Sequence, residues 1–138
     1  MWVGICVLVT NGVAGVWGGV AWLRKDPSIG FWYVLRAAQV AVVVQVVIGF
    51  LLVASGENAP DGLHMAYGVA PLLITLLSEG MRVGAAQREL EPVEDLERLD
   101  RSQQVALARR VAIAEMGVMT IGTLMILTLA LRAYQTGG

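Results

Sequence analysis

Three ionisable side chains lie inside long apolar stretches of this sequence or close to their ends: Arg36, Glu79 and Glu115. A charged side chain near the centre of a membrane helix costs roughly 2.5–3.5 kcal/mol on insertion scales, so such a group is a candidate for pairing or function. We therefore predict an ion pair inside the membrane between Arg36 and either Glu115 or Glu79. In the alternative arrangement, Arg36 extends to the lipid headgroups and Glu79 pairs with Arg82, one helical turn away. A proton relay would need a chain of ionisable groups that reaches the other side, and the sequence has none.

Neutral polar side chains also occur within the apolar stretches: Gln39, Gln45, Thr120, Thr123 and Thr128. Such groups can hydrogen-bond to one another or to the backbone of neighbouring helices, or they can line a polar cleft. Interhelical hydrogen bonding is the expected role. The alternative is a cleft whose lining residues are Arg36, Gln39, Gln45 and Glu115.

The first apolar stretch is rich in glycine. Gly15 and Gly19 form a G-x-x-x-G motif around Gly18, and Asn11 lies one turn before Gly15 on the same face. Small residues let two helix backbones approach closely in lipid, and an asparagine can hydrogen-bond across such a contact. We expect this face to pack against another helix, either inside the same bundle or on a partner protein.

His64 is the only histidine of the chain, and Tyr67 follows it one turn later. A bis-histidine haem needs two imidazoles, although ligation by His64 and a methionine is formally possible. We expect His64 and Tyr67 to be residues of the outer membrane interface that hydrogen-bond to a loop, to lipid or to a partner. The single cysteine, Cys6, can form no disulfide within the chain. The sequence therefore predicts no cofactor and no metal ligands.

Motifs of enzymatic catalysis are missing from the sequence. It contains no H-E-x-x-H helix, no glycine loop that would cradle a phosphate and no nucleophile with an evident base. We therefore expect that the protein is not an enzyme.

The composition indicates the environment in which these residues act. The chain has 138 residues, 57% of them hydrophobic and only 15% charged. An ordinary soluble domain is about 25% charged, so lipid is the expected solvent. The formal net charge of -1 provides no field that would attract nucleic acid. A chain of this length has room for about four membrane spans in a single domain.

Turn and capping residues divide the apolar stretches. Pro27 and Ser28 end the first stretch and begin the second, and residues 55–62 have the composition of a tight loop. The predicted fold is an all-α antiparallel bundle of four transmembrane helices. Its spans are about 2–23, 29–54, 63–83 and 111–131. We expect the polar segment 84–110 to form either a short helix at the membrane surface or an extension of the last span.

The distribution of Lys and Arg predicts the orientation. The first loop carries Arg24 and Lys25, the second carries none, and six basic residues fall between Arg82 and Arg110, among six acidic ones. Because basic loops stay in the cytoplasm, the first and third loops are predicted to be cytoplasmic and both termini to lie outside. This orientation places Arg36, Glu79 and Glu115 in the cytoplasmic leaflet.

The third span begins with Gly62-Leu63-His64-Met65-Ala66-Tyr67-Gly68-Val69-Ala70-Pro71. With four spans, an outside amino terminus and a mixed-charge inner segment, this sequence resembles small actinobacterial membrane proteins. Among these, it is similar to the respiratory supercomplex association factor of the cytochrome bcc–aa3 assembly. The resemblance implies binding to larger redox subunits, with no redox centre in this chain, and it assigns no functional residues.

The expected function is that of a non-catalytic accessory or assembly subunit in a complex of the bacterial inner membrane, most plausibly a respiratory one. Its expected partners are membrane lipid and larger integral membrane subunits. One alternative is a small homo-oligomeric transporter or channel that uses the polar cleft described above. Another is a quinone or haem binder that is completed by a partner subunit.

Overall fold

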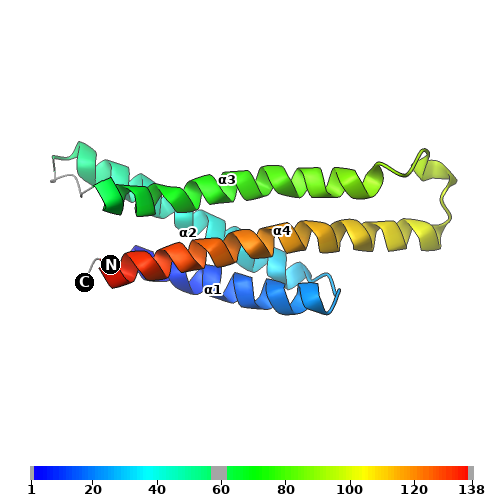
Figure 1. The fold of residues 1–138 in the computed structure, drawn as a ribbon, viewed down its shortest axis with the longest axis horizontal. Coiled ribbons are helices and arrows are strands. Elements are labelled where there is room, and N and C mark those ends of the chain that lie inside the picture. The colour runs from blue at the N-terminus through cyan, green and yellow to red at the C-terminus, as the bar shows by residue number, and fades with distance from the viewer. Residues whose placement is uncertain (1, 57–61, 137–138) are drawn as a thin grey trace.

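A computed structural model describes residues 2–56 and 62–136 of the chain. These residues form four α-helices and one short 3-10 helix: α1 (Trp2–Leu23), α2 (Ile29–Ala54), α3 (Gly62–Leu90), η1 (Leu96–Arg98) and α4 (Arg101–Thr136). The long helices form an elongated bundle in which both ends of the chain lie at the same end (Figure 1). All four are long and apolar enough to cross a membrane. The prediction of an all-α bundle with four membrane helices is confirmed.

A tight turn connects α1 to α2. Lys25 has a φ of 53°, which reverses the chain after α1. Ser28 is the N-cap of α2, and its hydroxyl oxygen accepts a hydrogen bond from the backbone N–H of Phe31 at 3.4 Å. The indole N–H of Trp17 donates to the same oxygen at 3.2 Å, so this cap also ties α1 to α2. The predicted boundary at Pro27 and Ser28 thus agrees with the structure.

The third and fourth helices extend beyond the predicted membrane spans. α3 continues past residue 83 to Leu90, and α4 begins at Arg101, which is the extension of the last span that we gave as one alternative for segment 84–110. With 36 residues, α4 is about 54 Å long, whereas the hydrocarbon core of a bilayer is about 30 Å thick. The segment 84–110 therefore forms a polar hairpin that extends past the α1–α2 turn, with η1 near its tip (Figure 1). The Ala, Leu, Gln, Glu and Arg residues of this hairpin have a high intrinsic helix propensity. They therefore favour helix even where the helix is not packed against another one.

A reciprocal cap begins α4 at the tip of this polar hairpin. The Asp100 carboxylate accepts hydrogen bonds from the Ser102 hydroxyl at 2.6 Å and from the backbone N–H of Gln103 at 2.8 Å. The Gln103 side chain accepts one from the backbone N–H of Asp100 at 3.1 Å. This exchange is the capping-box arrangement, and it explains why α4 begins ten residues before the apolar stretch.

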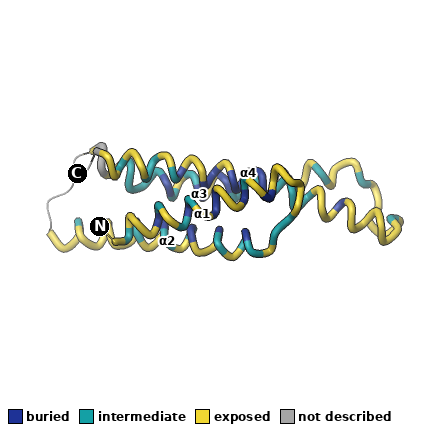
Figure 2. The backbone as a smooth tube through the Cα atoms, turned by 90° about the horizontal axis from the view of Figure 1, so that it is seen from below, coloured by how far each residue is buried: buried dark blue, intermediate teal, exposed yellow. Residues whose placement is uncertain are grey.

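Burial is concentrated along the axis of the bundle, and the outward faces are exposed (Figure 2). Two apolar clusters form the core. The hairpin-side cluster consists of Ala21, Phe31, Leu35, Met116 and Met119. The termini-side cluster consists of Val7, Val42 and Ile126, with Ala41, Leu72 and Ile74 packed against it.

Candidate functional site

Glu79 on α3 is the centre of a charged network between three helices. One carboxylate oxygen, Oε1, accepts hydrogen bonds from Arg36 Nη1 at 2.6 Å and from Gln39 Nε2 at 2.7 Å, both on α2. The other oxygen, Oε2, accepts from Arg82 Nε at 2.8 Å. Gln39 Oε1 in turn accepts from Arg36 Nη1 at 2.6 Å. With donors on both oxygens, the carboxylate serves as a structural acceptor that ties α2 to α3.

Arg82 extends the network to α4. Its Nη1 donates to Glu115 Oε1 at 2.9 Å, while its Nε remains bonded to Glu79. The Arg82 guanidinium also lies 5.7 Å from the ring centroid of Trp32, within the range of a cation–π contact. Trp32 meets Phe31 edge to face at 5.4 Å. A planar guanidinium can bond two carboxylates in a fixed geometry and stack on a ring at the same time, whereas a lysine ammonium lacks this planar geometry.

The structure pairs Arg36 with Glu79, one of the two partners we expected, and not with Glu115. Glu115 is instead bonded to Arg82. All three predicted ionisable residues nevertheless belong to one network. The sequence indicated Arg82 only as a local partner of Glu79, because a spacing of three residues is visible in the chain. Its second bond, to a residue on another helix, depends on how α3 and α4 are aligned.

The network is electrically balanced, with Arg36 and Arg82 opposite Glu79 and Glu115. The side chains of Glu79, Arg82 and Glu115 are 20–27% exposed, whereas that of Arg36 is 54% exposed. Arg36 therefore lies at the outer edge of the network, about 10 Å along α2 from Ile29. The arrangement holds α2, α3 and α4 in register and presents one guanidinium on the outside of the bundle.

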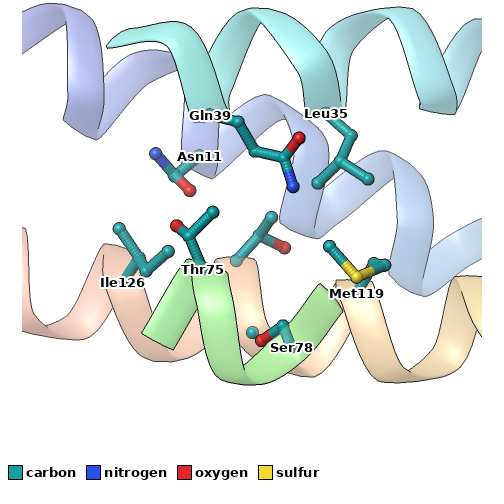
Figure 3. Close-up of a pocket in the computed structure, with 9 residues that line it drawn as sticks. Asn11, Leu35, Gln39, Thr75, Ser78, Met119 and Ile126 are labelled. Carbon is teal, nitrogen blue, oxygen red and sulfur yellow. The ribbon is translucent and has the colours of Figure 1, made fainter. Parts of the chain in front are cut away.

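A small polar cavity of about 10 Å³ lies between the four helices, next to this network. Figure 3 shows its lining side chains, which converge from α1, α2, α3 and α4. They are Asn11, Leu35, Gln39, Thr75, Ser78, Met119, Thr123 and Ile126, with Gly122 beside them. Gln39 belongs both to the cavity and to the charged network. Two of the neutral polar residues from the sequence analysis, Gln39 and Thr123, thus meet at one site.

The other neutral polar residues lie elsewhere. Thr128 is exposed, and its hydroxyl donates to the carbonyl of Leu124 in its own helix at 2.9 Å. Gln45 Oε1 and Thr120 Oγ1 are buried, and neither has a hydrogen-bond partner within the described part of the chain. Of the four residues of the predicted cleft, Gln39 lines the small cavity and Glu115 lines a separate groove. Arg36, Gln39 and Glu115 belong to the charged network, and Gln45 lies further along α2.

The glycine face of α1 points into the bundle. A methyl group at Gly18 would collide with the ring of Phe31 and the hydroxyl of Thr120, and one at Gly15 would lie 2.7 Å from a methyl carbon of Leu124. At Gly19 the nearest atom would be 3.9 Å away, which is ordinary contact. Asn11 is 1% exposed, and its amide donates to the carbonyl of Val7 at 2.9 Å, in its own helix. Gly15 and Gly18 therefore serve packing within the bundle.

The remaining predicted site residues are near the start of α3. Tyr67 is half-buried, whereas the side chain of His64 lies outside the described residues. Within residues 2–56 and 62–136, no group of three or more His, Cys, Asp or Glu side chains is placed to hold a metal ion.

An open groove of about 440 Å³ runs along the polar hairpin, from η1 to Glu115 on α4. Its lining is mainly apolar and consists of Leu90, Leu96, Gln104, Leu107, Ala108, Val111, Ala112 and Glu115. Glu115 thus borders both the groove and the charged network. Sequence analysis did not indicate this groove, because α3, η1 and α4 come together only through the hairpin.

The four apolar helices and the charged network between them define a multi-pass membrane protein of the four-helix class. No protein-family model matches the chain, and neither a curated protein nor a solved structure is similar to it. Its function must therefore be argued from its own residues.

Proposed function

We propose that this protein is a non-catalytic accessory or assembly subunit of a larger complex in the bacterial inner membrane. The single observation that carries this proposal is the position of Arg36. Its guanidinium is 54% exposed on the outside of the bundle, on a helix whose neighbouring surface residues, such as Tyr33 and Val40, are also exposed. A charge on the lipid-facing side of a membrane helix is stabilised when it reaches the headgroups or pairs with a polar group of another protein. Arg36 Nη1 already bonds to Glu79 and Gln39, and an adjacent subunit with an acidic or polar side chain at this level would bond to the N–H groups of the guanidinium that remain.

We further propose that the larger complex is respiratory, of the cytochrome bcc–aa3 kind. The support is the resemblance of residues 62–71 and of the four-span arrangement to a supercomplex association factor. In that role the chain would bind large integral subunits and lipid, and the redox centres would belong to the partners. Arg36 would contribute to the contact, while the rest of the network would keep α2 in the orientation that presents it.

A transporter or channel is less well supported by the geometry. The polar cavity is about 10 Å³, and Ile126 of the termini-side cluster is part of its lining. The charged side chains next to it are bonded to one another across three helices. These contacts favour a fixed bundle over one that opens a polar path.

The experiment is purification of the tagged protein from its native membranes in mild detergent, followed by mass spectrometry and a visible absorption spectrum. We expect large integral respiratory subunits and haem absorbance to co-purify with the wild type. The variant Arg36→Gln should lose most of both signals. The matched control is Arg98→Gln, which removes an 87% exposed arginine that pairs with Asp95 at 3.0 Å, and it should retain both.

A colourless homo-oligomer without other subunits would overturn the proposal. If haem co-purifies with the wild type and with Arg36→Gln in equal amounts, a complex exists but Arg36 does not mediate it. Substrate flux through purified protein in liposomes, abolished by Arg36→Gln, would instead establish the transport alternative. Haem or quinone that remains bound to the isolated chain would favour the alternative of a quinone or haem binder.

A further inference from the structure

The small polar cavity is unusual because every helix contributes a polar side chain to it. Asn11 comes from α1, Gln39 from α2, Thr75 and Ser78 from α3, and Thr123 from α4. In Figure 3 these side chains surround a common space among Leu35, Met119 and Ile126. Asn11, Thr75 and Thr123 are 1%, 8% and 3% exposed. Buried polar residues of all four helices therefore meet at this cavity, among apolar side chains.

The protons of the two threonine hydroxyls are already used. Thr75 Oγ1 donates to the carbonyl of Pro71 at 2.8 Å, and Thr123 Oγ1 donates to the carbonyl of Thr120 at 2.8 Å. A hydroxyl has only one proton, so each of these oxygens can act toward the cavity only as an acceptor. Asn11 uses one of its two amide protons for the carbonyl of Val7 and retains the other. The lining residues thus include at least two acceptors, the hydroxyl oxygens of Thr75 and Thr123, and at least one further donor, the amide of Asn11.

Each hydroxyl oxygen still has lone pairs that can accept a further hydrogen bond, so a ligand that donates to both oxygens would connect α3 to α4. The cavity volume of about 10 Å³ corresponds to the space that one water molecule needs. No carboxylate lines the cavity, so no negative charge is present to favour a metal cation over neutral water.

We propose that this cavity binds one water molecule. The water donates its two protons to the hydroxyl oxygens of Thr75 and Thr123, and it accepts a hydrogen bond from the side-chain amide of Asn11 or Gln39. The water therefore bridges α3 and α4. It also joins these two helices to α1 through Asn11 or to α2 through Gln39. Through Gln39 the water also supports the donor that holds Glu79.

Two buried methionines allow a direct test. Met119 lines the cavity and is 2% exposed, whereas Met116 is 0% exposed and does not line it. Brief X-ray irradiation of the full-length protein in detergent produces hydroxyl radicals from bound water, and these radicals oxidise the nearest side chains. Mass spectrometry should find Met119 oxidised several-fold more than Met116. Equal oxidation of the two would show that the cavity is dry and would overturn the proposal.

Substitutions then test which groups hold the water. The double variant Thr75→Val and Thr123→Val should reduce oxidation of Met119 to the level of Met116. The control Thr128→Val removes a hydroxyl that bonds to the carbonyl four residues earlier, as in Thr75, but that is exposed and outside the cavity. It should leave the labelling unchanged. If the double variant folds and Met119 remains oxidised, the two hydroxyls do not bind the water; if it fails to fold, the wild-type comparison decides.

A second measurement distinguishes water from a cation. The melting temperature of the wild type should be the same in NaCl and in choline chloride at equal ionic strength. A melting temperature that rises only with Na⁺ would show that the cavity binds a cation and would overturn the assignment of water.

Discussion

The contact between α1 and α4 differs in kind from the contact between α2 and α3. Where α1 meets α4, the backbones approach so closely that a methyl group at Gly18 would collide with Thr120. Where α2 meets α3, long side chains cross the gap, and Arg36 bonds to Glu79 at 2.6 Å. Asn11, a buried polar residue of α1, bonds within its own helix and not across this contact. The α1–α4 contact depends on the small size of glycine, whereas the α2–α3 contact depends on long charged side chains.

This difference follows from the physics of helices in lipid. Burial of apolar surface no longer favours helix association there, so close van der Waals packing and interhelical hydrogen bonds must hold the bundle together. Close packing leaves no room for a polar side chain between backbones, whereas helices farther apart can be joined by long charged groups. The two contacts should therefore respond to opposite kinds of substitution.

The largest effect is expected from Glu79→Gln. This change leaves the shape of the side chain and removes the charge that Arg36 and Arg82 share, so Arg36 loses its anionic partner and Arg82 keeps only Glu115. Loss of one partner of a buried ion pair costs about 3–5 kcal/mol, and because Glu79 is 27% exposed we expect about 3 kcal/mol. Denaturation with SDS in mixed micelles would measure it.

Glu89→Gln is the matched control for that change, because Glu89 lies on the same helix and meets Arg110 at 3.7 Å on the exposed polar hairpin. An exposed pair contributes about 0–1 kcal/mol. If Glu79→Gln destabilised the protein no more than Glu89→Gln does, the charged network would not be what holds α2 to α3.

The close contact is tested by Gly18→Ala. The new methyl group would meet the ring of Phe31 and the Thr120 hydroxyl, so Phe31 must shift within the hairpin-side cluster. Overpacking of this kind costs about 1–3 kcal/mol, and we expect about 2 kcal/mol by the same denaturation method. In Gly19→Ala, the next position along α1, the new methyl group would lie 3.9 Å from its nearest atom. This variant should leave the stability unchanged or increase it. Equal losses from the two variants would contradict a specific close approach at Gly18.

The variant Arg82→Lys separates the contribution of side-chain geometry to the network from the contribution of charge. A lysine keeps the positive charge but cannot bond Glu79 and Glu115 in the same way or stack on Trp32. We expect a loss of about 1–2 kcal/mol, the contribution of roughly one hydrogen bond to a charged group. Thermal unfolding in detergent, with Arg88→Lys as the control on the same helix, measures it. An unchanged melting temperature would mean that charge alone is sufficient.

The smallest effect should occur at the tip of the polar hairpin, outside both contacts. Hydrogen bonds from the Ser102 hydroxyl and from the backbone of Gln103 lower the pKa of Asp100 below its usual value of 3.8. The cap is therefore fully present above pH 3.8 and is lost as the pH falls through the lower pKa of the folded state. Below the pKa of Asp100 in the folded state, amide hydrogen exchange should become faster in the first turn of α4, while the rest of α4 is unaffected. Asp100→Ala should show the same fast exchange at neutral pH, and protection there would contradict the capping role.

Much of the fold follows from local patterns. The apolar stretches and the residues at Pro27 and Ser28 predict α1 and α2 with their observed ends. The spans predicted at 63–83 and 111–131 mark only the apolar parts of α3 and α4. Of the two alternatives for segment 84–110, the structure shows an extension of the last helix back to Arg101, and α3 also continues to Leu90. The polar hairpin continues both helices in water, where helix propensity and the Asp100 cap replace burial as the stabilising factors.

The sequence by itself determined that this protein has four helices long and apolar enough to cross a membrane, that three ionisable residues lie in or near the apolar stretches, and that the first helix is rich in glycine. Only the tertiary structure decided the partners: Glu79 for Arg36, Arg82 for Glu115, and one cavity for polar side chains from all four helices. The reason is that periodicity places a residue on a face of its own helix. The level at which it meets another helix depends on how the packed helices slide and tilt against one another.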